Sequence, residues 1–278
     1  WKVALWSLAS TEVWTTTDGL SYTYLGSAAP ANIADIIWHV SLAWIITYDG
    51  ANGGKIYTTA DFVTYTQRAV IKGAPKDGRW IGPYLDVAGA ISLYFCAGGK
   101  LQYIDTATYA LTEIALGKGV KAVKGALYNG ACVITDGQSC LRYQVSGNGT
   151  ETVSEIGWPQ FRKLPSELVG GRIRNLEGAP EVLYGIVDRA SAAGTAILDY
   201  TGIGWEVDSL LVNTTEEVHT AGIGVVPVIG DSTKRALYVV THNAALTSFR
   251  VSAMHLPIVG EHPVVGTDSF QDGPLKTY

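Results

Sequence analysis

The sequence predicts an all-β protein assembled from repeated four-stranded sheets, on three observations. The 278 residues include 32 Gly, 15 Tyr and 8 Trp, which favours short strands and tight turns, because aromatic side chains fit a pleated surface and Gly adopts turn conformations. No long segment combines helical hydrophobic periodicity with helix caps. The third and most specific observation is a short motif that recurs at a nearly constant interval.

The recurring motif has the form Thr-x-Asp-x-x-(Ser/Thr)-Tyr. Its defining residues in three copies are Thr16, Asp18, Ser21 and Tyr22, then Thr59, Asp61, Thr64 and Tyr65, then Asp105, Thr108 and Tyr109. The three Asp residues lie 43 and 44 positions apart. Two degenerate copies, at 146–150 and 199–205, continue the series after intervals of 43 and 51. The interval predicts a repeat of this length over most of the chain.

The motif has a local structural explanation. An Asp in a turn accepts hydrogen bonds from N–H groups two or three residues later, and this closes the turn without a partner strand. The following Ser or Thr adds a bond, and the aromatic ring is expected to pack between neighbouring sheets. Each copy is therefore expected to close the turn between the last two strands of one repeat, with no role in chemistry required.

The segments between these turns read as strands in groups of four. The expected strands, in order, are 34–40, 42–48, 55–59 and 63–69; 78–87, 91–97, 101–105 and 110–115; 121–128, 131–135, 140–145 and 152–156; 170–176, 181–187, 195–200 and 205–211; and 219–228, 235–241, 246–252 and 256–259. The first repeat has room for three strands only, at 3–7, 12–16 and 21–26. A fourth strand for this repeat is expected from the C-terminus, within 263–270.

Repeats of this kind predict a single β-propeller domain over residues 1–278, with six four-stranded blades; five and seven are the alternatives. The expected blades are 1–30 with the C-terminal strand, 31–72, 73–117, 118–166, 167–213 and 214–262. Strands from both termini would then close the ring in the first blade. Closure of this kind removes an open sheet edge, which is the recurring problem of β architectures.

The motif resembles the Asp-box, or bacterial neuraminidase repeat, of sialidase-like β-propellers. Residues 16–22 match its shorter variant with Tyr in place of the usual Trp, and residues 59–65 match it with Phe62 in place of Gly. The motif is also similar to the Ser-x-Asp-Leu-x-x-Trp turns of arabinanase- and invertase-like propellers. The resemblance implies a propeller fold, and such propellers include glycosidases, secreted receptors and proteins of tailed-phage particles. The short polar-aromatic repeats and sparse charge look most like the phage group.

Composition and spacing argue against several classes of partner. The net charge is −5 and the basic residues are scattered, so no basic stripe for nucleic acid is expected. The most apolar stretch, 33–48, is short and contains Asp35 and His39, which argues against a membrane span. No Cys or His spacing predicts a metal site, and no cofactor motif is complete. Cys132 and Cys140 flank an Asp-Gly turn, so both a disulfide and two buried thiols remain open.

Catalysis would require specific groups near the propeller axis. A sialidase-like enzyme needs three converging Arg residues, an acid/base Asp and a Tyr–Glu pair, and related glycosidases need paired carboxylates. The candidates by position are Asp35, His39, Arg79, Asp86, Arg172, Arg174, Glu177, Glu216, Glu217 and His219. The Arg-Ile-Pro signature of sialidases is absent, and we assign no catalytic residue.

The richest cluster is 170–177, where strand alternation is expected to place Arg172, Arg174 and Leu176 on one face. With Glu177 and Trp158 it forms a candidate anion- or sugar-binding patch. The alternative is a set of inter-blade salt bridges or a solvated lining of the channel. Trp158 and Trp205 could likewise stack on a sugar or pack between blades.

The sequence therefore favours a non-catalytic propeller that serves as a structural or adhesive module of an extracellular assembly, such as the tail or receptor-binding part of a tailed-phage virion. Its expected partners are other protein subunits and a surface glycan. The expected location is extracellular or virion-associated. The alternative is a glycoside hydrolase or lyase that uses axial carboxylates.

Overall fold

A computed structural model of the chain describes residues 3–6, 11–16, 23–24, 29–49, 53–72, 77–117, 119–157, 171–179, 181–188, 194–202, 204–212, 219–228, 231–242 and 249–256. The chain divides into two compact units. The first unit comprises residues 1–125 and 143–153, and the second comprises residues 126–142 and 154–278.

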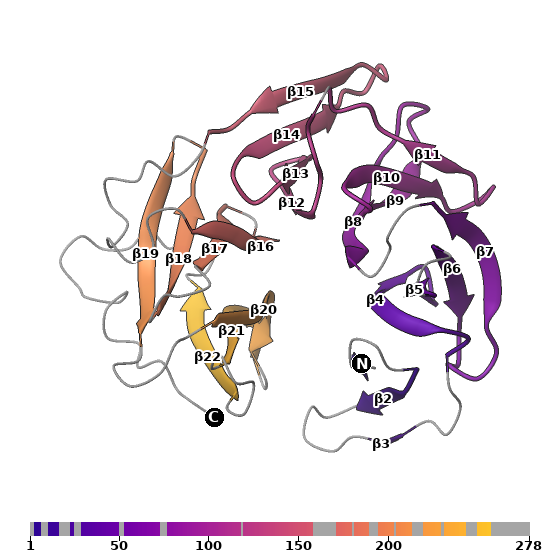
Figure 1. Ribbon diagram of the computed structural model, residues 1–278, viewed down its shortest axis with the longest axis horizontal. Coiled ribbons are helices and arrows are strands. Elements are labelled where there is room, and N and C mark those ends of the chain that lie inside the picture. The colour runs from indigo at the N-terminus through magenta and orange to yellow at the C-terminus, as the bar shows by residue number, and fades with distance from the viewer. Residues whose placement is uncertain are drawn as a thin grey trace. The chain divides into compact units, whose positions relative to one another are not determined.

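The first unit contains three sheets whose strands follow one another in sequence order (Figure 1). The first sheet has three strands, β1 (Val3–Trp6), β2 (Val13–Thr16) and β3 (Thr23–Tyr24). The second consists of β4 (Asn32–His39), β5 (Leu42–Tyr48), β6 (Gly54–Thr59) and β7 (Thr66–Ile71). The third consists of β8 (Arg79–Leu85), β9 (Ile91–Ala97), β10 (Lys100–Asp105) and β11 (Leu111–Glu113).

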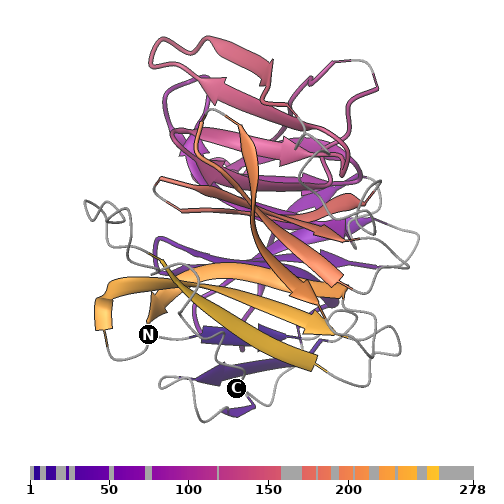
Figure 2. The same cartoon turned by 90° about the vertical axis from the view of Figure 1, so that its left-hand side faces the viewer.

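A fourth sheet contains β12 (Lys124–Tyr128), β13 (Ala131–Thr135), β14 (Cys140–Val145) and β15 (Glu151–Glu155), and the division between the units passes through it. The second unit continues with β16 (Arg172–Gly178), β17 (Leu183–Asp188), β18 (Gly194–Tyr200) and β19 (Trp205–Val212). Its last sheet has β20 (His219–Val228), β21 (Asp231–His242) and β22 (Phe249–Leu256), drawn in orange to yellow in Figure 2.

The all-β prediction is confirmed, and the bounds of β5, β9, β13, β14 and β20 agree with the expected strands. The strand expected at 63–69 is instead β7, Thr66–Ile71, because the turn that precedes it extends to residue 65. The prediction that a strand begins at Leu256 is wrong, since Leu256 is the last residue of β22. Residues 257–259, and the closing strand expected within 263–270, lie outside the described residues.

A β-bulge recurs in the first strand of four sheets. The pairing register shifts after the second residue of β4, β8, β16 and β20, so the bulged residues are Ala34, Ile81, Arg174 and Ala221. Ala34 and Ile81 are 47 positions apart, as are Arg174 and Ala221. A bulge bends its strand and increases the local twist, and in these four first strands it occurs at the same position. The 47-residue interval between bulged residues is slightly longer than the intervals of 43 and 44 residues between the Asp residues of the motif.

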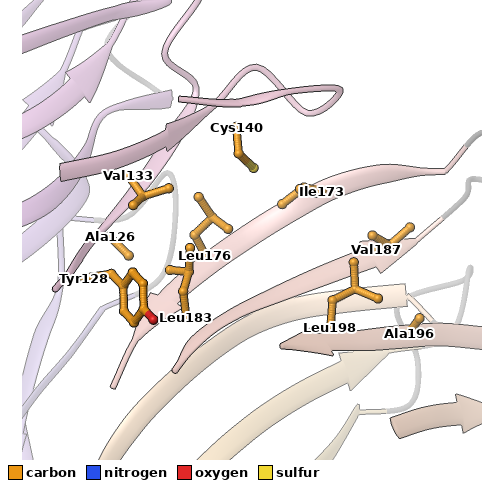
Figure 3. Packing of buried hydrophobic residues seen from close by; sticks show 10 residues of the cluster. All are labelled: Ala126, Tyr128, Val133, Cys140, Ile173, Leu176, Leu183, Val187, Ala196 and Leu198. Atoms are coloured by element: carbon orange, nitrogen blue, oxygen red, sulfur yellow. The ribbon is translucent and has the colours of Figure 1, made fainter. Parts of the chain in front are cut away.

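Each unit has its own apolar core. In the first unit, Trp44, Ile46 and Ile56 pack with Trp80 and Phe95 of the next sheet. Figure 3 shows the second-unit cluster, in which β12, β13 and β14 pack against β16, β17 and β18 through ten buried residues: Ala126, Tyr128, Val133, Cys140, Ile173, Leu176, Leu183, Val187, Ala196 and Leu198. The strands β5, β9 and β13 are buried along both faces, and apolar residues of each sheet pack against the next sheet.

The cysteines are buried thiols, which resolves the alternative left open by the sequence. Cys96, Cys132 and Cys140 form no disulfide and all three are buried. Burial raises the pKa of the Cys96 and Cys140 thiols to about 12, so both stay protonated at neutral pH and are poor nucleophiles.

The hairpin between β4 and β5 has an unfavourable sequence for its conformation. Val40 and Ser41 have φ angles of 45° and 64°, and positive values at both positions are typical of a type I′ turn, which prefers Asn-Gly. The hairpin between β12 and β13 has this favoured sequence, Asn129–Gly130, with φ angles of 46° and 65°. A β-branched residue with positive φ is a genuine outlier.

Changing Val40→Asn and Ser41→Gly together is expected to raise the free energy of unfolding by about 1–2 kcal/mol, because both residues then tolerate the left-handed conformation. Urea denaturation measures the change. The reverse exchange, Asn129→Val with Gly130→Ser, is the matched control and is expected to destabilise by a similar amount. Equal stability of the two variants and the parent would contradict the strain.

Candidate functional site

The Asp61 side chain closes the turn between β6 and β7. Its Oδ1 accepts hydrogen bonds from the N–H groups of Val63 and Thr64, both at 2.8 Å. The Thr59 hydroxyl donates to Asp61 Oδ1 at 3.1 Å and accepts from the Phe62 N–H at 2.8 Å. These donors lower the pKa of Asp61 below its ordinary value of 3.8. The turn therefore satisfies its own backbone groups without a neighbouring strand.

The next two copies of the motif have related geometry. Asp105 Oδ1 accepts from the N–H groups of Ala107 at 2.7 Å and Thr108 at 3.2 Å. The Thr108 hydroxyl donates to Asp105 Oδ2 at 2.7 Å, and these bonds lower the pKa of Asp105. In the turn between β14 and β15, Asn148 Oδ1 accepts from the Thr150 N–H at 3.1 Å.

The aromatic residues that end the motif fix the turns to the sheets. The Tyr65 hydroxyl donates to the carbonyl of Phe62 at 2.9 Å. The Tyr109 ring centroid lies 6.1 Å from that of Trp44, and the Arg68 guanidinium lies 4.2 Å from the Tyr109 centroid. Tyr109 thus links the third sheet to the second.

The first and fifth copies differ from these. Thr16 is the last residue of β2, while Asp18, Ser21 and Tyr22 lie outside the described residues. In the fifth copy, Asp199 lies within β18, as the expected strand 195–200 predicts, and pairs in register with Glu206 of β19.

Two further Asp residues close turns that the repeat motif did not include. Asp86 was a candidate axial carboxylate, but it is buried in the turn between β8 and β9, where its Oδ1 accepts from Ala88 N at 2.9 Å and Ala90 N at 3.0 Å. Asp136 Oδ1 accepts from Gln138 N at 2.7 Å and the following N–H at 2.8 Å. An Asp followed by small or polar residues between two apolar runs was the available signal.

Thr59→Val is expected to lower the free energy of unfolding by about 1–3 kcal/mol, because it leaves the buried Phe62 N–H without its acceptor. Thr59 is itself buried, so the valine keeps the shape and removes only the hydroxyl. Thr112→Val, on an exposed face of β11, is the matched control. A loss no larger than that of the control would exclude this role for Thr59.

A cluster of charged side chains in the first unit lies where β4, β8 and β12 begin. Asp35 follows the bulged residue of β4, and its Oδ2 accepts from the Trp80 N–H of β8 at 2.8 Å while Oδ1 accepts from Ile36 N at 2.9 Å. Arg79 Nη1 donates to the carbonyl oxygens of Ala34 at 3.0 Å and Gly78 at 2.6 Å. The main chain therefore holds both side chains in place.

Burial dominates the titration of this group. Desolvation raises the pKa of Asp35 to about 6, although the two N–H donors and the charges of Arg79 and Lys124 act in the opposite direction. Desolvation and then the charge of Arg79 lower the pKa of Lys124 to about 8, against the effect of Asp35. A carboxyl and an amine titrating near neutral pH are typical of catalytic sites, and also of buried structural networks.

Glu177 is the corresponding group of the second unit. It lies on β16, and its Oε1 accepts from the Val225 N–H of β20 at 3.2 Å. Burial raises the pKa of Glu177 to about 7, while this hydrogen bond lowers it. In both units, a carboxylate on the first strand of a sheet accepts a hydrogen bond from the first strand of the next sheet.

The predicted patch on β16 is only partly assembled. Arg172 and Arg174 are both exposed, whereas Leu176 is buried in the core with Ile173. The expectation that Leu176 shares the face of the two arginines is wrong, because the bulge at Arg174 inserts one residue and reverses the alternation after it. Glu177 is turned to β20, as described above.

The structure describes only some of the remaining candidates. Trp158, Glu216 and Glu217 lie outside the described residues. Trp205 packs on Tyr200, with ring centroids 5.2 Å apart, and contacts the second-unit core, as its packing alternative predicts. In the part of the chain that the structure describes, no three His, Cys, Asp or Glu side chains are grouped to hold a metal ion. Across those same residues, no helix has the length and apolarity needed to cross a bilayer.

Comparisons with known proteins identify the fold. No protein-family model matches the chain, and no curated protein matches it in sequence. Virginiamycin B lyase from Staphylococcus aureus superposes with a TM-score of 0.54 at 13% identity, over 92% of this chain and 80% of that one. YCF48 from Cyanidioschyzon merolae gives 0.53 at 14% identity, over 84% and 72%. A complex of S. cerevisiae Dbp5 with Nup159 and Gle1 gives 0.53 at 10% identity, over 89% and 69%.

These structural relatives are β-propeller-like proteins. Together with the successive four-stranded sheets, they show that the chain has a β-propeller fold, as the sequence predicts. At identities of 10–14% the likeness concerns the fold alone.

Proposed function

We propose that this chain is a non-catalytic β-propeller module that docks other protein subunits within an extracellular assembly. The observation that carries the proposal is the use of two partly buried carboxylates on the first strands of their sheets. Asp35 and Glu177 are the groups that acid–base chemistry would need, and each instead accepts a main-chain hydrogen bond from the next sheet, at Trp80 and Val225. A carboxylate engaged in this way links sheets, which is a structural role.

The more specific part of the proposal is an Asp-box propeller of a tailed-phage virion, in its tail or its receptor-binding apparatus, with a surface glycan as a second ligand. The turns at Asp61 and Asp105 support the Asp-box relationship, since each Asp accepts two N–H groups within its turn. A rigid set of sheets with variable turns suits docking, because loops tolerate change without loss of the core. Extracellular or virion-associated location follows from this assignment.

At least one structural relative has protein partners, since Nup159 occurs in a complex with Dbp5 and Gle1. That association belongs to the relative. For this chain the support is internal: large apolar side chains, among them Val40 and Val63, are exposed on turns of the first unit. Exposed apolar residues that gather on one surface are typical of interaction sites.

The alternative is a glycoside hydrolase or lyase. One observation favours it: the pKa values of about 6 for Asp35 and about 7 for Glu177 lie in the range expected of a general acid. Hydrolysis by paired carboxylates requires two such groups on opposite sides of one scissile bond.

Product formation from a panel of sialosides, arabinans and other polysaccharides separates the two functions. The panel is incubated with the parent chain and with the variants Asp35→Asn and Glu177→Gln, and reducing ends and unsaturated products are measured. The docking function predicts no product above buffer from any of the three proteins. Turnover by the parent that is lost in either variant would overturn it and establish the enzyme.

A further inference from the structure

The sheets of the first unit have two chemically different ends. In an antiparallel sheet of sequential strands, the turns that join strands one to two and three to four lie at one end, and the turn that joins strands two to three lies at the other. We name the first the hairpin end; for β4–β7 and β8–β11 it comprises residues 40–41, 60–65, 86–90 and 106–110. The opposite end, where the chain also passes to the next sheet, is the linker end.

Contacts between turns support this grouping. At the hairpin end, the Trp38 and Phe62 rings lie 5.7 Å apart, and the Thr106 hydroxyl donates to the Ile91 carbonyl at 3.4 Å. At the linker end, the Gly98 N–H donates to Asp77 Oδ1 at 3.0 Å. Between the two sheets, Asp35 Oδ2 accepts from the Trp80 N–H at the linker end, and the Arg68 guanidinium lies 4.2 Å from the Tyr109 ring centroid near the hairpin end. The corresponding ends of the two sheets therefore lie on the same side.

The turn between β14 and β15 joins the hairpin end. Gly149, with φ of 81°, lies so close to Val87 that an added Cβ would be 2.5 Å from the Val87 carbonyl oxygen. Only a glycine with its free φ permits this approach. The hairpin end thus extends from the second sheet to this turn.

Exposed apolar side chains gather at the hairpin end. Its members, with the exposed fraction of each, are Trp38 39%, Val40 78%, Val63 59%, Val87 43% and Ile91 50%. The strained Val40–Ser41 turn presents the most exposed of them. Strain that is retained where a relaxed sequence is available often accompanies function.

The two ends also differ in charge among the residues described in these two sheets and their connections. The hairpin end carries the acidic residues Asp61 and Asp105 at its surface and the buried Asp86 beneath them. The linker end carries the basic residues Lys55, Lys72, Arg79, Lys100, Lys121 and Lys124. Its acidic residues are Asp35, beside Arg79 and Lys124, and Asp49, Asp77 and Glu113, of which Glu113 pairs with Lys100 at 2.7 Å. Six basic and four acidic residues leave this end with a net charge of +2. The basic end is therefore opposite the acidic and apolar end.

We propose that the hairpin end of the first unit docks on the linker end of a second copy of this chain, head to tail. The charge of each end complements the other, and the apolar side chains supply area to bury. Because the two surfaces differ, the contact is heterologous, and repetition extends it from copy to copy. The proposal rests on the proposed docking function and names its partner.

Lysine substitutions at the hairpin end test the contact in the full chain. Val63→Lys with Val87→Lys places positive charge against the basic linker end and is expected to weaken self-association at least about tenfold. The matched control is Thr112→Lys with Val153→Lys, which changes exposed residues in the middle of the outer strands β11 and β15, away from both ends, and is expected to leave association unchanged. Sedimentation velocity over a concentration series measures association, and thermal unfolding verifies that each variant folds.

A charge exchange makes the test specific for opposite ends. Lys72→Glu with Lys121→Glu is expected to abolish self-association on its own, and an equimolar mixture with Val63→Lys/Val87→Lys is expected to restore it. A parent chain that stays monomeric, equal weakening by the control, or a mixture that does not associate would each overturn the proposal. A monomeric parent that occurs in its native source with other proteins would overturn self-docking while the docking function stands.

Discussion

Replacing Gly178 by Ala is expected to lower the free energy of unfolding by about 3 kcal/mol, because the added methyl group meets main chain that cannot rotate away. Gly178 is the last residue of β16, and its Cβ would lie 1.8 Å from the carbonyl oxygen of Leu127 in β12 and 2.9 Å from the carbonyl carbon. Relief would require the two strands to separate. The second-unit core lies between these strands, with Ala126, Tyr128 and Leu176 among its members.

Chemical denaturation of the variant and the parent measures this loss. Gly204→Ala is the matched control, since a Cβ at Gly204 meets nothing within 4 Å, and its effect is expected to stay within about 0.5 kcal/mol. If the two variants have the same stability, β12 and β16 are not packed as described. A loss confined to Gly178→Ala would establish the close approach of these first strands.

The second large effect is on pH dependence: the protein is expected to be more stable at pH 5 than at pH 8. The pKa of Asp35 is raised to about 6 and that of Glu177 to about 7. A carboxyl with a raised pKa in the folded state contributes stability that is fully present below its unfolded value, 3.8 for Asp and 4.5 for Glu, and is lost as the pH rises through the folded value. Between pH 8 and pH 5 the two groups together are expected to contribute about 4 kcal/mol.

Other groups act outside this window. The pKa of Lys124 is lowered to about 8, so its unfavourable contribution is nearly constant below pH 7. Asp61 and Asp105 have lowered pKa values, so their contribution is lost only as the pH falls below the unfolded value of 3.8. Stability is therefore expected to be highest near pH 5 and to fall on both sides.

Urea denaturation at pH 5 and pH 8 measures the difference. The variant Asp35→Asn with Glu177→Gln keeps an acceptor oxygen at each position and removes the titration. It is expected to be more stable than the parent at pH 8 and to lose most of the pH dependence. All other titratable groups are present in both proteins and cancel in the comparison. A variant that is less stable than the parent at pH 8 would contradict the assignment of Asp35 and Glu177.

The strands were predictable because the signals that define them are local. The run at 91–97 and its boundary turns specify β9 without reference to the rest of the chain, and so do those of β5 and β13. The Asp residues of the repeat motif were also readable, since an Asp that accepts the N–H groups two and three residues later needs only its own turn. Asp61 and Asp105 are found in such turns.

The first-strand features were not predictable, because they depend on neighbouring strands. The bulged residues are Ala34, Ile81, Arg174 and Ala221, which share no side-chain chemistry that marks a bulge. The bulge at Arg174 reversed the expected orientation of Leu176. The roles of Asp35 and Glu177 likewise arise from backbone N–H groups 45 and 48 positions away, and the residue types do not reveal such partners.

The size of the native particle that contains this chain tests the proposed function most directly. The chain is isolated from its natural source without overexpression, and the mass of the species that carries it is measured by sedimentation together with the identity of its partners. The docking function predicts a multi-subunit species in which this chain is one component. A chain that is monomeric and free of other proteins would contradict it.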